Sequence, residues 1–242
     1  MSLDLLQRYG PQLLQGLLVT LQLVAVSLVL GAILAIPITA GRLARNRFVG
    51  ALAFSYVYFF RGTPLLAQLF LIYYGAGQFR PAFDAVGLWW LFRDAFNCAV
   101  LAFALNTAAY QAEIYRGAIR SMPRGQWEAG QALGLHRLPI LYKIVLPQAA
   151  MVALRPLGNE IILMIKGSAV ASIVTVFDLM GQTRVAFSRS FDMTIYLYAA
   201  VLYLLMVEAI RRIWNRIEAR LTRHLRREGR AIPAADLVPA TH

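Results

Sequence analysis

The sequence predicts an all-α fold, a polytopic bundle of about five transmembrane helices, and two observations carry this prediction. Of the 242 residues, 59% are hydrophobic and only 15% are charged, which is far more apolar than an ordinary soluble domain. The apolar residues also form long runs, since residues 10–41 and 95–112 contain no charged side chain. A helix needs about 20 residues to cross the hydrocarbon layer, so runs of this length favour membrane spans.

Five segments, taken in order along the chain, are predicted to cross the membrane. The first, at about 12–40, is too long for the apolar core of a cleaved signal peptide, so we expect it to be retained. In the second stretch, 48–79, Thr63 followed by Pro64 indicates a helix N-cap and a first-turn proline. The span proper is therefore predicted to begin at Pro64, with 48–60 as a separate helix near the interface. The other spans are predicted at about 95–115, 147–178 and 194–213.

The basic residues are sorted between the connections, and this sorting predicts the orientation of the chain. Of 24 Lys and Arg residues, sixteen fall in the connections on one side and five in those on the other. The first set is 41–50, 114–146 and 211–230, and the second is 1–10, 79–94 and 179–193. Such an asymmetry is the positive-inside signal rather than a phosphate-tracking face, so no nucleic-acid partner is expected. The N-terminus is predicted to be periplasmic and the C-terminus cytoplasmic.

The spans carry no arrangement that is typical of an enzyme. No Gly-x-x-x-x-Gly-Lys-Ser/Thr phosphate loop is present, so another chain would have to bind ATP. Cys98 is the one cysteine, which excludes an internal disulfide and argues against a metal cluster. We therefore expect no cofactor and no metal site in this chain, with Cys98 as a buried packing residue and His136 at the surface.

The chain is interpreted as a single membrane domain over 1–230, followed by a disordered tail at 231–242. Residues 209–228 alternate arginines with Ile, Trp and Leu at helical spacing. This pattern is typical of an extension of the last span along the membrane surface, and a solvated basic helix is the alternative.

The longest connection on the predicted cytoplasmic side, 114–147, carries the most specific pattern. Residues 123–125 predict a turn, and a short helix is predicted over 126–135, where Gly130 and Gly134 would share a face. Each glycine costs about 1 kcal/mol relative to alanine in a helix interior. The pair therefore points to close approach of another backbone or insertion into a cleft, and a linker with incidental glycines is the alternative.

This connection resembles the EAA loop of ABC-importer permeases. Glu128-Ala129-Gly130, Gly134 after three residues, and Ile144-Val145-Leu146-Pro147 after nine more match the family pattern, with Gly130 in place of the second alanine. The resemblance implies a type I ABC importer permease fold, in which a coupling helix at about 124–137 docks in a groove on an ATPase subunit. The coupling residues that it implies are Glu128, Ala129, Gly130, Gly134, Leu135, Ile144, Leu146 and Pro147.

Further motifs resemble the polar amino-acid branch of that family. They are Phe60-Arg61-Gly62-Thr63-Pro64-Leu65, Asn106-Thr107 with Tyr110, and Asn159-Glu160-Ile161-Ile162-Leu163-Met164. Together they most resemble the M-type permeases of histidine, lysine, arginine and ornithine importers and of the related opine importers. The resemblance implies an inner-membrane subunit that works by alternating access. Its implied partners are a second, similar permease, two ATPase subunits that bind ATP and Mg, and a periplasmic amino-acid-binding protein.

The predicted fourth span holds the candidate substrate residues. Charged side chains at membrane depth tend to mark a transport path, and Glu160 lies about 13 residues beyond Pro147, roughly 20 Å along a helix. A carboxylate there could pair with a cationic side chain or an α-ammonium group. Asn159 is the second candidate, and Pro156 and Gly158 would loosen the helix midway.

Three alternatives stay open. Glu160 could instead form an internal ion pair with Lys166. The importer could carry another polar amino acid or an opine. A different class of protein, an ion-coupled secondary amino-acid transporter, is the main rival, although it would not explain the glycine-bearing cytoplasmic helix.

Overall fold

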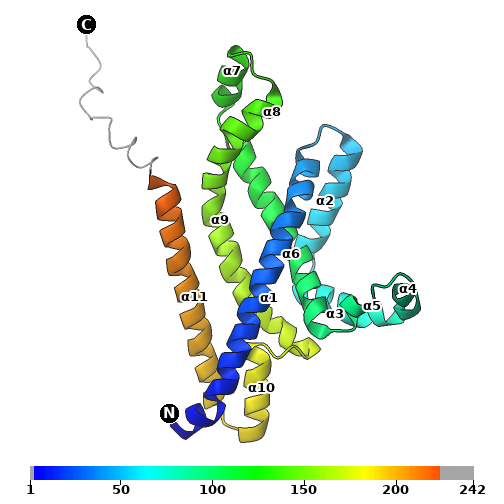
Figure 1. Cartoon of the computed structure of the whole chain (residues 1–242), viewed down its shortest axis with the longest axis vertical. Helices are drawn as coiled ribbons and strands as arrows, with labels where there is room; N and C mark the ends of the chain where they lie inside the picture. The colour runs from blue at the N-terminus through cyan, green and yellow to red at the C-terminus, as the bar shows by residue number, and fades with distance from the viewer. Residues whose placement is uncertain (1–2, 224–242) are drawn as a thin grey trace, which may run out of the picture.

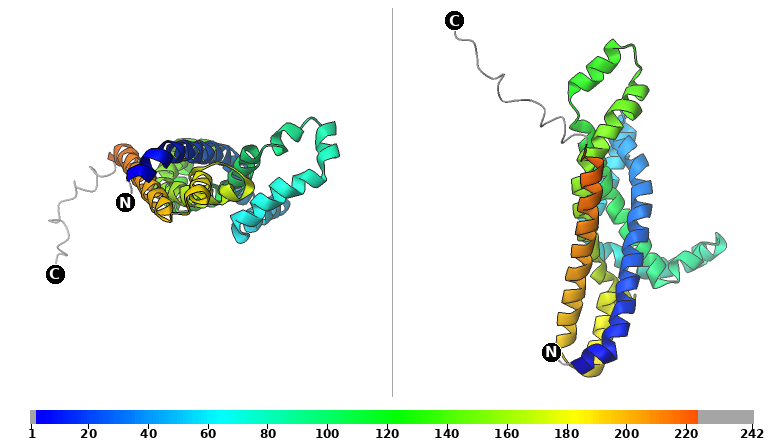
Figure 2. Two further views of the ribbon diagram at one scale, coloured as in Figure 1. Left: turned by 90° about the horizontal axis from the view of Figure 1, so that it is seen from below. Right: turned by 60° about the vertical axis from the view of Figure 1, so that its left-hand side comes forward.

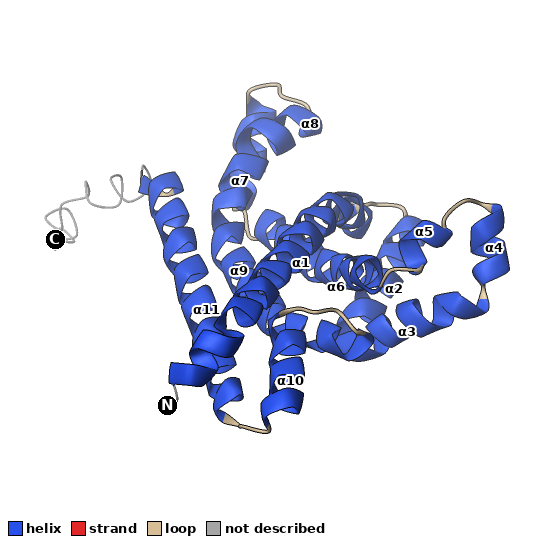
Figure 3. Cartoon of the chain, turned by 60° about the horizontal axis from the view of Figure 1, so that its bottom comes forward, coloured by secondary structure: helices blue, strands red, loops and turns tan. Residues whose placement is uncertain are grey.

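The computed structural model describes residues 3–223, and all regular structure within them is helical, which confirms the all-α fold class (Figures 1 and 3). The α-helices are α1 (Leu3–Leu43), α2 (Arg47–Gly62), α3 (Leu65–Gln78), α4 (Arg80–Ala85), α5 (Trp89–Phe92), α6 (Ala95–Arg120), α7 (Arg124–Ala132), α8 (Arg137–Ile140), α9 (Leu146–Gly167), α10 (Leu179–Ser190) and α11 (Thr194–Leu221). A π-helix, η1, covers Leu141–Val145, and a 3₁₀ helix, η2, covers Ser168–Val174. The predicted tail at 231–242 and the end of the predicted domain lie outside the described residues.

The long helices run side by side along one axis, with α7 and α8 projecting at one end and α10 lying at the other (Figure 1). The segment from α3 to α5 leaves the bundle sideways (Figure 2). Within the described residues, three helical segments are long and apolar enough to cross a membrane: Asp4–Leu43, Arg137–Val174 and Thr194–Leu221. α6 has the length, at 26 residues, but buried Asn106 and Gln111 make it less apolar. The number of spans, about five, stays a prediction.

The core forms where α1 lies along α6. Buried side chains from six helical elements meet there, among them Leu23, Leu69, Phe103, Ile165, Val174 and Met206. The two helices approach closely because small residues line the contact: a Cβ on Gly31 would clash with the methyl group of Thr107. Small residues allow such close approach between membrane helices, where apolar burial alone gives little drive to associate.

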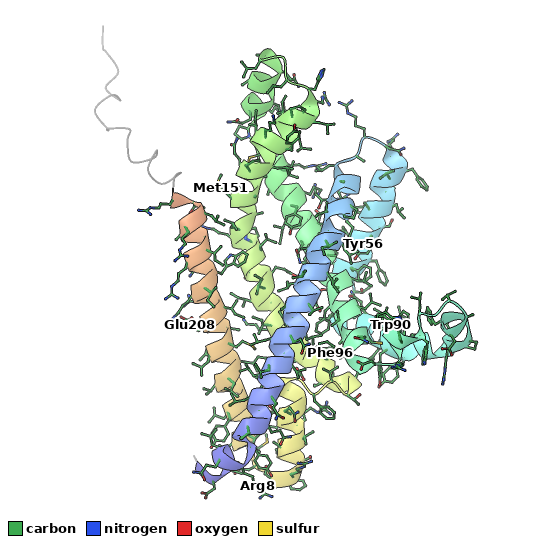
Figure 4. All side chains as sticks on the ribbon, viewed as in Figure 1. Arg8, Tyr56, Trp90, Phe96, Met151 and Glu208 are labelled. Carbon is green, nitrogen blue, oxygen red and sulfur yellow. The ribbon has the colours of Figure 1, made fainter. Side chains whose placement is uncertain are left out.

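The predicted break near Thr63 is present, but its capping differs from the prediction. Thr63 is the C-cap of α2, and its hydroxyl donates to the carbonyl of Phe59 at 2.8 Å instead of capping α3. α2 is a separate helix, as predicted, and it packs against α1 and α6, where Tyr56 donates to the carbonyl of Leu105 at 2.7 Å (Figure 4). The capping prediction failed because the hydroxyl of Thr63 bonds to the carbonyl four residues before it, and this local bond competes with capping of the next helix.

The carbonyl groups left free at this break are satisfied by two buried amide side chains. Gln68 donates to the carbonyl of Phe60 at 2.9 Å and to the hydroxyl of Thr63 at 2.7 Å. Asn106 on α6 donates to the same carbonyl of Phe60 and to the side-chain oxygen of Gln68, both at 3.0 Å. The break is thereby fixed to α6.

α9 stays a continuous helix through Pro156, although this residue has no amide hydrogen to donate to the carbonyl of Val152. Gly158 makes room for a side chain of another helix, because the indole ring of Trp214 on α11 occupies the space where the Cβ of a larger residue would stand. The indole N–H also donates to the carbonyl of Leu154 at 2.9 Å. Nearby, Arg155 and Glu218 form an ion pair at 2.7 Å, so two contacts hold α11 against α9.

At the opposite end of the bundle, Asp178 begins α10 and is fully buried. Its carboxylate accepts from the amide of Gly181 at 2.8 Å, while Thr20 on α1 accepts from the amide of Leu179 at 3.0 Å. Within the described residues, the second carboxylate oxygen of Asp178 and the hydroxyl of Tyr203 are buried without a hydrogen bond.

Candidate functional site

α7 ends at Ala132, earlier than predicted, in a Schellman motif. The amide of Gly134 donates to the carbonyl of Gln131 at 2.9 Å, and the amide of Leu135 donates to the carbonyl of Gly130 at 3.0 Å. Gly134 has φ +75° with open space around it, so a left-handed backbone, not a close approach, requires the glycine. The prediction that Gly134 shares a helix face with Gly130 is therefore wrong.

Gly130 allows a close contact, but with a side chain of the same chain, whereas another backbone or a cleft was predicted. A Cβ at this position would lie 2.7 Å from Cγ1 of Ile140, which is fully buried. Gly130 therefore allows α8 to fold back onto α7. We call residues 124–140 the α7–α8 hairpin.

The α7–α8 hairpin joins α9 through a π-helical turn. Pro147 has no amide hydrogen and cannot donate to the carbonyl of Lys143 as an α-helical residue would. The backbone widens over Leu141–Val145, and the amide of Leu146 donates to the carbonyl of Leu141. The side chain of Gln148 then reaches back to Gln126 at 3.3 Å and ties the hairpin to α9.

Exposed apolar side chains cover the projecting end of the α7–α8 hairpin. Leu133 is 79% exposed and Leu138 is 72% exposed, and Glu128 and Ala129 are exposed beside them. Of the other predicted coupling residues, Leu135, Leu146 and Pro147 are exposed and Ile144 is half-buried. Apolar side chains gathered on a projecting tip are typical of a protein contact.

Glu160 lies in the middle of α9 and faces α6. It is 7% exposed, and its carboxylate accepts a hydrogen bond from the hydroxyl of Thr107 at 2.8 Å. The guanidinium group of Arg61 is near enough to interact electrostatically with this carboxylate and lies 5.1 Å from the ring centre of Tyr110. Residues of α2, α6 and α9 therefore meet around one buried carboxylate.

The alternative ion pair between Glu160 and Lys166 is not formed. Six residues turn an α-helix by about 600°, so the two side chains leave α9 in different directions. Glu160 is buried whereas Lys166 is exposed. Among residues 3–223, no acidic or basic side chain forms an ion pair with Glu160.

The structure does not bring Asn159 and Glu160 together. Asn159 is exposed and lines a groove between α9 and α11, together with Arg155, Trp214 and Glu218. The two candidate substrate residues thus point in directions about 100° apart around α9, one exposed and one buried.

Thr107 and Gln111 hold Glu160 in place, and no role was predicted for either residue. The hydroxyl of Thr107 also accepts from the side chain of Gln111 at 3.2 Å, and Gln111 donates to the carbonyl of Leu28 at 3.2 Å. Polar side chains four residues apart inside an apolar span are a signal that could have found them, because such groups need partners away from water.

Residues 3–223 contain no group of three or more His, Cys, Asp and Glu side chains that could hold a metal ion. Cys98 is buried, and its thiol donates to the carbonyl of Phe92 at 3.3 Å.

The family model described as "binding-protein-dependent transport system inner membrane component" matches residues 26–223. The chain belongs to this family. The members are transport components, so the chain is a permease subunit and not an enzyme, as predicted, and ATP hydrolysis is the work of separate subunits.

Curated relatives match almost end to end. The nopaline transport system permease protein of Agrobacterium fabrum is 40% identical, over 97% of this chain and 98% of the relative. The arginine ABC transporter permease of Haemophilus influenzae is 39% identical, over 89% and 94%. The histidine/lysine/arginine/ornithine transport system permease of Salmonella typhimurium is 37% identical, over 92% and 98%.

Solved structures agree with the fold. A chain of an amino acid ABC transporter with histidines superposes with a TM-score of 0.81 at 32% identity, over 91% of this chain and 100% of that chain. A chain of the MetNI methionine ABC transporter superposes with a TM-score of 0.74, over 92% of this chain and 100% of that chain. Its sequence is 22% identical, so this similarity supports the fold alone.

Proposed function

We propose that this permease carries a cationic amino acid, such as arginine, histidine, lysine or ornithine, from the periplasm to the cytoplasm by alternating access. The family and the named relatives support the more general statement that the chain is a permease subunit of an amino-acid or opine ABC importer. Two of the three relatives compared above are named for the transport of arginine, and the third for the transport of nopaline.

The buried carboxylate of Glu160 carries the proposal for a cationic substrate. Removing a carboxylate from water costs several kcal/mol unless a cation or hydrogen bonds compensate it. Thr107 supplies one hydrogen bond and Arg61 a nearby positive charge, but no ion pair is formed. A substrate ammonium or guanidinium group reaching Glu160 would supply the missing partner. Asn159 faces the groove between α9 and α11. We propose that it contacts the substrate only if this groove forms part of the transport path.

The α7–α8 hairpin is proposed to dock on an ATPase subunit. Its predicted coupling residues bring one carboxylate, small side chains and exposed leucines to a tip outside the bundle. The remaining proposed partners are a second, similar permease, a second ATPase subunit and a periplasmic binding protein. ATP and Mg would be bound by the ATPase subunits.

Reconstitution of the whole transporter tests this function. Uptake of labelled arginine or histidine should require ATP, the ATPase subunits and the binding protein together. Uptake by this chain alone, driven by an ion gradient, would favour a secondary transporter instead.

Glu160→Gln tests the substrate contact. The change keeps the shape of the side chain and removes its charge, so transport and substrate-stimulated ATP hydrolysis with cationic substrates should fall at least tenfold. Basal ATP hydrolysis should persist. Asn159→Ala is the neighbouring control and should have the smaller effect. Unchanged cationic transport in Glu160→Gln would show that the carboxylate does not contact the substrate.

A further inference from the structure

The C-terminal part of α11 carries two exposed stripes that the transport path does not use. The arginine stripe consists of Arg216 and Arg220 on α11 and Arg223 just beyond its C-cap, all exposed. The aliphatic stripe consists of Ile213, Ile217 and Leu221, which are 54%, 40% and 50% exposed. Residues four apart share a helix face, so the two stripes run side by side along the helix.

The arginine stripe keeps its positive charge. Arg211 and Arg212 pair with Glu208 at 2.7 and 2.6 Å, and Arg155 pairs with Glu218. Among residues 3–223, no carboxylate forms an ion pair with the arginine stripe. Three guanidinium groups within about 11 Å of helix repel one another, and an anion placed between them removes that cost.

The length of α11 allows the arginine stripe to lie at the level of the lipid headgroups, with the hydrocarbon layer taken to begin at Thr194. α11 runs without interruption from Thr194 past Glu208, so its basic part continues the span rather than turning along the membrane surface (Figures 1 and 4). Arg216 stands about 33 Å and Arg220 about 39 Å beyond Thr194 along the axis. A hydrocarbon layer about 30 Å thick that begins at Thr194 ends near residue 214, and the headgroups continue for about 5–8 Å beyond it, so Arg216 falls among the headgroups and Arg220 at their outer edge.

We propose that the arginine stripe binds the phosphate groups of anionic phospholipids, while the aliphatic stripe rests on the boundary between headgroups and acyl chains. A guanidinium group matches a phosphate with two parallel hydrogen bonds, which makes arginine better suited than lysine. A neutral phospholipid carries the same phosphate, but the cationic group of its own headgroup competes with the arginines for that phosphate. Preference for an anionic headgroup is therefore the property that the surface should show.

Lipid retention by the assembled transporter tests the proposal. The complex is incubated in detergent with equimolar dioleoyl phosphatidylglycerol and phosphatidylcholine, and bound lipids are counted by native mass spectrometry. The wild type should retain phosphatidylglycerol preferentially, and 0.5 M salt should weaken this preference because exposed charges are screened. The variant Arg216→Gln/Arg220→Gln/Arg223→Gln should lose about fivefold in preference per arginine removed.

A matched control removes the same charge at other sites. Arg8→Gln/Arg93→Gln/Arg189→Gln changes three exposed arginines outside α11 and should keep the preference. Equal loss in both variants, or none in the first, would overturn the proposal. Loss of the ATPase subunits from the first variant with unchanged lipid preference would assign the surface to a protein contact and overturn it too. Neither readout depends on which amino acid is carried.

Discussion

At the residue scale, the buried carboxylates Glu160 and Asp178 are held in different ways. Glu160 accepts one side-chain hydrogen bond and lies near Arg61. Asp178 accepts a backbone amide at the start of α10 and leaves one oxygen without a partner. The first arrangement suits exchange of a charged partner, whereas the second fixes the backbone.

Asp178→Asn should change how stability depends on pH. Asp178 lies beyond the candidate span that ends at Val174, and burial raises its pKa to about 6 from the usual value of 3.8. Because the folded-state pKa is above the unfolded one, its stabilising contribution is full below about pH 4 and is lost as the pH rises through 6. The linkage is on the order of 3 kcal/mol. Asn keeps the cap without the charge.

The thermal unfolding midpoint of the purified protein, measured from pH 4.5 to 8, checks this prediction. Asp178→Asn should be more stable than the wild type at pH 8, and the difference should shrink toward pH 4.5. Asp178→Ala, which loses the cap, should be less stable than Asp178→Asn at every pH. Parallel curves for the wild type and Asp178→Asn would contradict the assigned charge burial.

The sequence indicated that Glu160 is unusual, since a carboxylate inside an apolar run stands out. Its partners could not be predicted, because Thr107 lies 53 positions away and only the packing of α9 on α6 brings it near. The same holds for Gly158, whose reason is Trp214 on a different helix. Chemistry can be read from local spacing, but contacts between distant segments depend on the fold.

At the element scale, Gly134 should be replaceable by asparagine but not by valine. Asn tolerates the left-handed backbone that ends α7, whereas a β-branched residue there is strongly disfavoured. Gly134→Val should therefore disturb the α7–α8 hairpin and lower substrate-stimulated ATP hydrolysis several-fold in the assembled transporter. Gly134→Asn should retain most of it. Equal loss in both variants would mean that the absence of a side chain, not the backbone conformation, is what Gly134 provides.

The α7–α8 hairpin also shows why element boundaries are hard to predict. Two glycines four apart look alike in the sequence, yet Gly130 admits Ile140 and Gly134 ends the helix. The sequence predicted a helix to residue 135 because alanine and leucine are good helix formers. In the structure, the Schellman hydrogen bonds end the helix earlier. A helix is present where the family pattern points, at Arg124–Ala132, but the pattern does not separate the roles of the two glycines.

At the scale of the whole molecule, single cysteines should report the orientation of the bundle. Leu133 on the α7–α8 hairpin is 79% exposed and Phe191 after α10 is 81% exposed, and they lie at opposite ends. In the proposed orientation, a membrane-impermeant maleimide added to spheroplasts should label Phe191→Cys but not Leu133→Cys. Inside-out vesicles should show the reverse. The native Cys98 is buried, so the parent protein is the low-labelling control.

The opposite labelling pattern would reverse the proposed orientation, and labelling of both sites from one side would contradict the arrangement of the ends. The charge asymmetry made this prediction possible without a fold. The sideways course of α3 to α5 could not be predicted in the same way, because hydropathy gives the length of a segment but not its direction.

The junction between α2 and α3 has a mechanical consequence. Its free carbonyl groups are clamped by Gln68 and Asn106, so bending there would break several buried hydrogen bonds at once. α2, α3 and α6 should therefore move as one rigid block during transport. α11 is joined to α9 by the indole of Trp214, by the Arg155–Glu218 ion pair and by apolar packing around Met206. The block formed by α2, α3 and α6 is therefore the part of the permease that we expect to keep its internal geometry while other helices shift around it.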